Sequence, residues 1–112
     1  MPTGKPELLA GTLEMLVLKT LSFGPRHGYG IAQHIQRLSR DALRVEEGSL
    51  YPALQRMLAK GWVTAEWKSS PTGRRARYYT LTTAGKRQLG EEAESFDKAV
   101  AAIMAVMRAA KA

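Results

Sequence analysis

The stretch of this chain that decides its fold is EEGSLYPALQRMLAKGWV, residues 46–63. It predicts a helix over residues 48–59, because four apolar residues fall on one stripe when each residue turns by about 100°; they are Leu50, Leu54, Met57 and Leu58. The opposite face is polar and cationic, with Ser49, Tyr51, Gln55, Arg56 and Lys60. Pro52 is expected in the first turn, where its missing N–H costs nothing, and Gly61 ends the helix.

Two shorter helices are predicted upstream of this stretch. Thr12 is expected to cap a helix that runs to about residue 22 and stops at Gly24-Pro25. Its apolar residues, Leu16 among them, spread over more than one face, so it needs a second surface to pack against besides its own core. A second helix is predicted over residues 28–39, with one apolar stripe formed by Ile31, Ile35 and Leu38.

A β-hairpin is predicted downstream. Residues 62–68 alternate, with Val63, Ala65 and Trp67 on one side of a strand. Residues 69–73 (SSPTG) are typical of a loop, and residues 74–82 form a second β-rich run. The fold class is therefore mostly α-helical with a small β-hairpin.

The last segment, residues 83–110, predicts one long helix of roughly 40 Å. Its apolar residues step alternately by four and three, which is the spacing of a two-per-seven seam: Leu89, Ala93, Phe96, Val100, Ile103 and Met107. This seam could pack on the chain's own core. A domain of this size supplies only a small core, however, so a two-fold dimer interface that also uses Leu16 is the favoured interpretation.

Composition points to one basic domain and to an acidic partner. The chain has 112 residues, a formal net charge of +7 and no cysteine, which excludes a disulfide scaffold, a thiolate zinc site and a cysteine nucleophile. Residues 1–87 carry +8 and residues 88–112 carry −1. No run is apolar enough for a membrane span or a signal peptide, so a cytoplasmic location is expected, on the nucleoid when DNA is bound.

Catalysis is not expected. The two histidines, His27 and His34, lie about 10 Å apart along a helix, too far to share a metal ion. Glu46 and Glu47 are explained by their favourable interaction with a helix dipole. No phosphate-binding glycine loop and no nucleophile with a recognisable base is present. We therefore predict no enzyme, no metal and no cofactor.

Three helices followed by a hairpin is the element order of a winged helix-turn-helix, whose third helix enters the DNA major groove while the hairpin, or wing, lies along the backbone or minor groove. The predicted wing carries four cations and no acid, with Lys68, Arg74, Arg75 and Arg77. A solvated helix face and an edge hairpin kept soluble by charge are the alternative interpretations. The alternative function is that of a non-specific nucleic-acid-binding or chromosome-architectural protein.

Four stretches, taken in chain order, resemble the PadR family of bacterial transcriptional regulators. They are GTLEMLVLKTLSFGP (11–25), HGYGIAQHI (27–35), EEGSLYPALQRMLAKGWV (46–63) and RRARYYTLTTAG (74–85). The single last helix resembles the compact subfamily. The resemblance implies a homodimeric repressor that binds a palindromic operator in double-stranded DNA. Its DNA-facing positions would be Tyr29, Ser49, Tyr51, Pro52 and Arg74–Arg77.

The chain is expected to divide into three parts. Residues 1–10 would be an N-terminal arm, residues 11–82 the winged helix-turn-helix domain and residues 83–112 the dimerisation helix. In compact regulators of this type, a groove between the dimer helices can admit flat aromatic effectors. Here it would be lined by Phe96, Val100 and Met104, although a lone Phe on a helical seam is more often a core residue.

Overall fold

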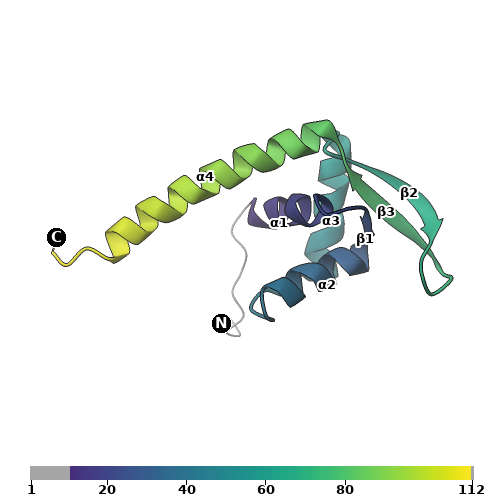
Figure 1. The fold of residues 1–112 in the computed structure, drawn as a ribbon, viewed down its shortest axis with the longest axis horizontal. Helices are drawn as coiled ribbons and strands as arrows, with labels where there is room; N and C mark the ends of the chain where they lie inside the picture. The colour runs from purple at the N-terminus through teal and green to yellow at the C-terminus, as the bar shows by residue number, and fades with distance from the viewer. Residues whose placement is uncertain (1–10, 112) are drawn as a thin grey trace.

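The computed structural model describes residues 11–111, so the predicted arm over residues 1–10 lies outside the described residues. The described chain has four helices and a small antiparallel sheet (Figure 1). In chain order the elements are α1 (Thr12–Leu21), β1 (Arg26–His27), α2 (Gly28–Leu38), α3 (Glu47–Ala59), β2 (Val63–Ser69), β3 (Arg75–Leu81) and α4 (Thr83–Met107). The predicted fold class, a winged helix with one long last helix, is confirmed.

Two helix starts differ from the prediction. Thr12 does not cap α1, because the N-cap is Gly11, whose φ of 84° lies in the left-handed region. α3 starts at Glu47, one residue early, with Glu46 as its N-cap. Pro52 lies in the second turn of the helix, so its expected place in the first turn was wrong, and the carbonyl of Gly48 lacks its usual partner four residues on.

The sheet contains one strand that the periodic pattern did not predict. β1 is only two residues long, too short to show alternation. It pairs with the far edge of β3, Arg26 opposite Tyr79 and His27 opposite Tyr78, which gives the order β1-β3-β2. β2 and β3 form the predicted hairpin, in a register from Val63 opposite Leu81 to Ser69 opposite Arg75.

The core lies where α1, α2, α3 and the base of the sheet meet. The predicted stripe of α3 is buried there, while Leu58 lies partly buried at its edge. On α2, Ile31 and Ile35 are buried but Leu38 is 65 % exposed, so the apolar stripe continues past the buried part of the helix. Leu38 is the last residue of α2 and lies beyond the end of the core. The buried apolar residues are Val17, Leu18, Leu21, Ile31, Ile35, Leu50, Ala53, Leu54, Met57, Val63 and Tyr79.

α4 extends from this core as a single long helix (Figure 1). Its start is held tightly: the Thr82 hydroxyl accepts from the Gly85 N–H at 3.0 Å and donates to the Gly61 carbonyl at 2.7 Å. Gly85 is buried, and a Cβ there would collide with the Trp62 carbonyl. The first turns of α4 pack on α1 and place Leu89 against the core. The contacts of its first turns thus set the direction of α4.

Candidate nucleic-acid interface

The outer face of α3 is polar and open to solvent, as its pattern predicted. Ser49, Pro52, Gln55 and Lys60 are exposed along it. The Lys60 ammonium lies 4.6 Å from the ring centroid of Trp62, which holds this cation at the end of the helix nearest the hairpin. The face combines a hydroxyl, an amide and a cation, the groups that contact base edges and phosphates.

Arg56 differs from these residues because its side chain forms an ion pair within the chain. Its Nη2 lies 3.4 Å from Oε1 of Glu14 on α1. The Glu14 side chain is 15 % exposed and the Arg56 side chain 53 %. The guanidinium is therefore turned toward the flank of α1, and a contact with DNA competes with a partly exposed ion pair worth at most about 1 kcal/mol.

Tyr51 packs against the start of α2. A Cβ added to Gly28 would lie 2.7 Å from the Tyr51 hydroxyl oxygen and 2.9 Å from its ring, so a larger residue there would require the Tyr51 side chain to shift. Burial, followed by the charge of Glu47 and then Tyr79, raises the pKa of Tyr51 above its usual value. The phenol keeps its proton at neutral pH and remains a hydrogen-bond donor at the α2–α3 junction.

His27 links α2 to the wing, a role that the sequence pattern did not reveal. Its Nδ1 accepts from the Gly30 N–H at 3.0 Å, which caps α2. Its ring lies nearly parallel to that of Tyr29, at 6.5 Å, and edge-on to that of Tyr78, at 5.3 Å. The Lys68 ammonium lies 5.1 Å from the ring centroid of Tyr78. A continuous row of aromatic and cationic groups thus runs from the wing to the exposed Tyr29, and the cap position is the signal that could have indicated His27.

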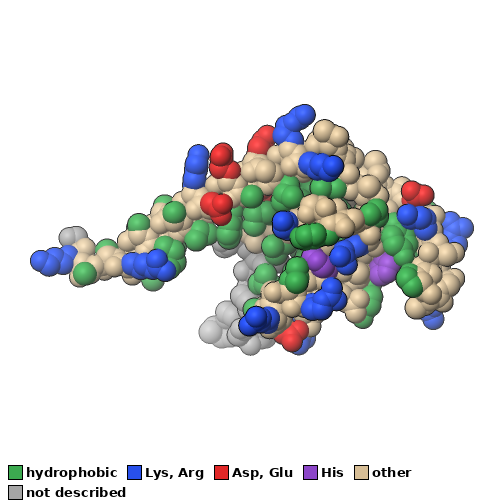
Figure 2. Space-filling model, viewed as in Figure 1, with side chains coloured by type: hydrophobic (Ala, Val, Ile, Leu, Met, Phe, Trp, Pro, Cys, Tyr) green, Lys and Arg blue, Asp and Glu red, His purple; other side chains and the backbone are tan. Residues whose placement is uncertain are grey.

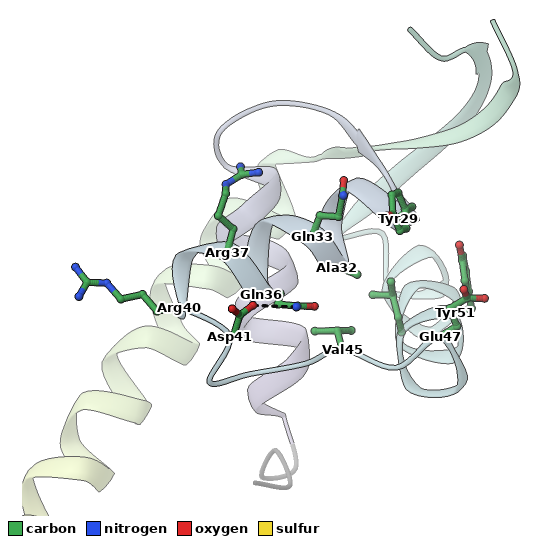
Figure 3. Close-up of a pocket in the computed structure, with 12 residues that line it drawn as sticks. Tyr29, Ala32, Gln33, Gln36, Arg37, Arg40, Asp41, Val45, Glu47 and Tyr51 are labelled. Carbon is green, nitrogen blue, oxygen red and sulfur yellow. Dashed lines mark hydrogen bonds between the residues drawn. The ribbon is translucent and has the colours of Figure 1, made fainter. Parts of the chain in front are cut away.

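A groove of about 520 Å³ separates α2 from α3 (Figure 3). Tyr29, Gln33 and Arg37 recur every four residues along one side of α2, and Tyr51 and Glu47 line the groove from α3. Gln33 and Arg37 were missed, although their spacing from Tyr29 was visible in the sequence. The groove therefore joins two predicted DNA-facing residues, Tyr29 and Tyr51, with a further cation and amide.

The predicted wing cations lie on both faces of the hairpin. Alternation from the register places Arg75 and Arg77 on one face and Lys68 on the other, with Arg74 in the loop before β3. Arg75 lies over the ring of Trp67 at 6.0 Å and Arg77 over that of Tyr79 at 5.9 Å. Figure 2 shows blue Lys and Arg side chains around the wing, around α2 and along α4, with most of the visible red acidic side chains over α4. Positive charge therefore lies on the wing and on α2, both of which contact α3.

The seam of α4 is largely open in the single chain. Phe96 is 39 % exposed, Val100 38 %, Ile103 54 % and Met107 74 %. Leu89 and Ala93, nearer the core, are only partly exposed, as are Leu16 on α1 and Met104 on α4. The structure thus separates the seam into a short part that packs on its own domain and a longer part without a partner in the described chain.

His34 lies in the core and away from the exposed face of α3. His34 is buried, with Nδ1 3.1 Å from the Thr20 hydroxyl, and burial together with the charges of Arg26 and Arg37 lowers its pKa. Among residues 11–111, no three His, Cys, Asp or Glu side chains gather into a possible metal site. No helix in the same part of the chain is long and apolar enough to cross a membrane.

Comparisons with known proteins agree with this geometry. The family model described as "Transcriptional regulator PadR-like family" matches residues 17–91. A transcriptional regulator of Mycobacterium tuberculosis is 38 % identical over 63 residues, 56 % of this chain and 58 % of its own. An uncharacterised 37.1 kDa protein in a Streptomyces fradiae transposon is 42 % identical over 82 residues, which cover 73 % of this chain but only 22 % of that protein.

Solved structures share most of this fold. A PadR-like transcriptional regulator from Bacillus cereus superposes with a TM-score of 0.76 at 28 % identity, covering 90 % of this chain and 96 % of its own. A PadR family transcription regulator from Clostridium difficile gives a TM-score of 0.73 at 27 % identity, covering 87 % and 99 %. These proteins are transcriptional regulators rather than enzymes. The winged-helix fold, the cationic wing and the family match lead to one conclusion: this chain belongs to the PadR-like family of transcriptional regulators.

Proposed function

We propose that the chain acts as a homodimeric repressor that binds an inverted repeat in double-stranded DNA. The observation that carries this proposal is the α4 seam, which projects from the core with Phe96, Val100, Ile103 and Met107 exposed. A contiguous apolar strip of this kind marks an interaction surface. A second copy of the same helix offers a matching strip, and two-fold pairing closes the assembly.

A two-fold dimer also suits the DNA. Two α3 helices related by a two-fold axis would enter successive major grooves, and an inverted repeat has the same symmetry. In this proposal Ser49, Tyr51, Gln55 and Arg56 face base edges. Phosphate contacts come from the wing cations, Lys60 and Tyr29. Arg56 would leave Glu14 to reach DNA, so Gln55 is the cleaner probe of base readout.

The dimer would provide a switch. Phe96, Val100 and Met104 would line the space between the two α4 helices, where a flat hydrophobic or aromatic effector would fit. Such a molecule can change DNA affinity only if it binds the dimer more tightly at one distance between the two α4 helices than at another. Repression in the cytoplasm, with relief by an effector, is the resulting regulatory scheme.

The experiment that tests the proposal is a genome-wide pull-down of DNA fragments with the purified chain at about 150 mM salt, a physiological ionic strength. Gln55→Ala is run beside it as the matched variant, because Gln55 is exposed and makes no described contact that folding needs. We expect a few promoter fragments that share a palindrome, with base preference relaxed at one position in the variant. Uniform recovery of DNA would refute operator binding and favour a non-specific nucleic-acid coat.

A further inference from the structure

Trp67 is a large apolar side chain on the wing that the fold leaves uncovered. It belongs to the alternating face of β2, along which Val63 is buried, Ala65 is half-buried and Trp67 is 58 % exposed. The face begins in the core, where Ala65 is paired with the buried Tyr79, and continues past it. Packing within the domain therefore explains Val63 but not Trp67.

The same face of the hairpin is cationic. Arg77 lies opposite Trp67 in the register, and Arg75 lies opposite Ser69, the next residue on this face. The Arg75 guanidinium is 6.0 Å from the centroid of the Trp67 ring. Glu66, the acidic residue within β2 and β3, points to the other face, because it is paired with Tyr78. Trp67 thus stands among cations with no carboxylate on its own face.

We propose that Trp67 contacts DNA, with its indole against deoxyribose sugars while Arg75 and Arg77 on the same face bind the flanking phosphates. A strip in which an apolar ring alternates with cations matches the sugar–phosphate backbone, where apolar C–H groups alternate with anions. The inference rests on the proposed function, since it takes DNA as the ligand of the wing.

Fluorescence gives a direct test. The chain contains two tryptophans, Trp62 and Trp67, so Trp62→Phe leaves Trp67 as the only indole. Acrylamide quenching is measured with and without a fluorescein-labelled duplex about three helical turns long, and the anisotropy of the label reports binding separately. We expect bound duplex to lower the quenching constant of Trp67 severalfold. Equal quenching in the free and bound protein overturns the contact.

Affinity against salt gives a second test that does not need the Trp62 substitution. Trp67→Ala should weaken binding about tenfold with an unchanged salt slope, because an apolar contact displaces no counterions. Trp67→Phe should retain most of the affinity. Arg75→Ala should lower the slope by about 0.9 instead. Thr80→Ala, an exposed position on the opposite face of the hairpin, is the control and should change neither quantity.

The outcomes separate the inference from the function on which it rests. Normal DNA binding by Trp67→Ala overturns the inference and leaves the proposed function intact. A lower salt slope in Trp67→Ala also overturns it, because the indole would then act only by holding Arg75. Failure of the unaltered chain to bind any duplex overturns both.

Discussion

Ile103 offers the sharpest test of the α4 seam as a dimer interface. It lies well beyond the part of α4 that packs on the core, and it is 54 % exposed in the single chain. Truncation to Ala removes the apolar surface while keeping a strong helix former, so α4 itself is not weakened. Any loss should therefore fall on association rather than on folding.

The size of this loss can be worked out from the exposure. Complete burial of an isoleucine side chain contributes about 1.5–3 kcal/mol. The exposed fraction of 54 % scales this to roughly 0.8–1.6 kcal/mol in each protomer. Two copies meet in a two-fold dimer, so Ile103→Ala should cost roughly 1.6–3.2 kcal/mol, a weakening of the dimer by about 15- to 200-fold. Ile103→Asp would bury two like charges and should abolish the dimer.

Sedimentation velocity over a concentration series measures the dimer dissociation constant, and circular dichroism checks the helix content of each variant. Ala105→Asp is the matched control, because it adds the same charge to the same end of α4 on the face about opposite the seam. We expect Ala105→Asp to remain dimeric and Ile103→Asp to be a folded monomer. A dimeric Ile103→Asp, or equal dissociation of both Asp variants, would refute the assignment of the seam.

Three further predictions concern the wing, the α2–α3 junction and the buried histidine. Replacing both Arg74 and Arg75 with Ala should lower the salt slope of DNA binding by about 1.8, measured by fluorescence anisotropy, because two phosphate contacts are lost; an unchanged slope would place these arginines away from the phosphates. Gly28→Ala should cost at most about 1 kcal/mol in urea unfolding, since the new Cβ meets only the far end of the exposed Tyr51 side chain, which can move aside. The same substitution should cost less in a Tyr51→Ala background, and an equal cost would contradict the collision. The folded-state pKa of His34 is lowered, so the unfolded chain binds more protons below the usual value of about 6.5. Stability is then complete above that value and is lost as the pH falls through the lowered pKa. The urea midpoint should drop more between about pH 7 and about pH 5 in the unaltered chain than in His34→Gln, and parallel pH profiles would count against this linkage.

Much of the fold could be predicted because its signals are local. The stripe of α3, the alternation of the hairpin and the uninterrupted run of α4 each lie within one element, and the structure shows all three. The missed features lie between elements. β1 has two residues and exists only because β3 offers it a free edge. Leu38 follows the helical stripe, yet the core ends before it.

The candidate site divides in the same way. Composition and spacing were enough to indicate a polar face on α3 and a cationic wing, because exposed charged residues can be identified in the sequence without knowing their tertiary contacts. The Glu14–Arg56 ion pair joins residues 42 positions apart, and the row from Lys68 through Tyr78 and His27 to Tyr29 crosses three strands and a helix start.

The sequence by itself therefore determined which elements form and which faces are apolar, cationic or polar, because helix and strand periods are properties of neighbouring residues. Only the tertiary structure decided which of those faces remained open. Val63 and Trp67 share one face of β2, but Val63 packs in the core while Trp67 is more than half exposed. Leu89 and Ile103 share the seam of α4, but Leu89 packs against the core while Ile103 is more than half exposed. The reason is physical: a small core covers only the apolar surface that it can reach, and what it leaves uncovered is available for a second copy or for DNA.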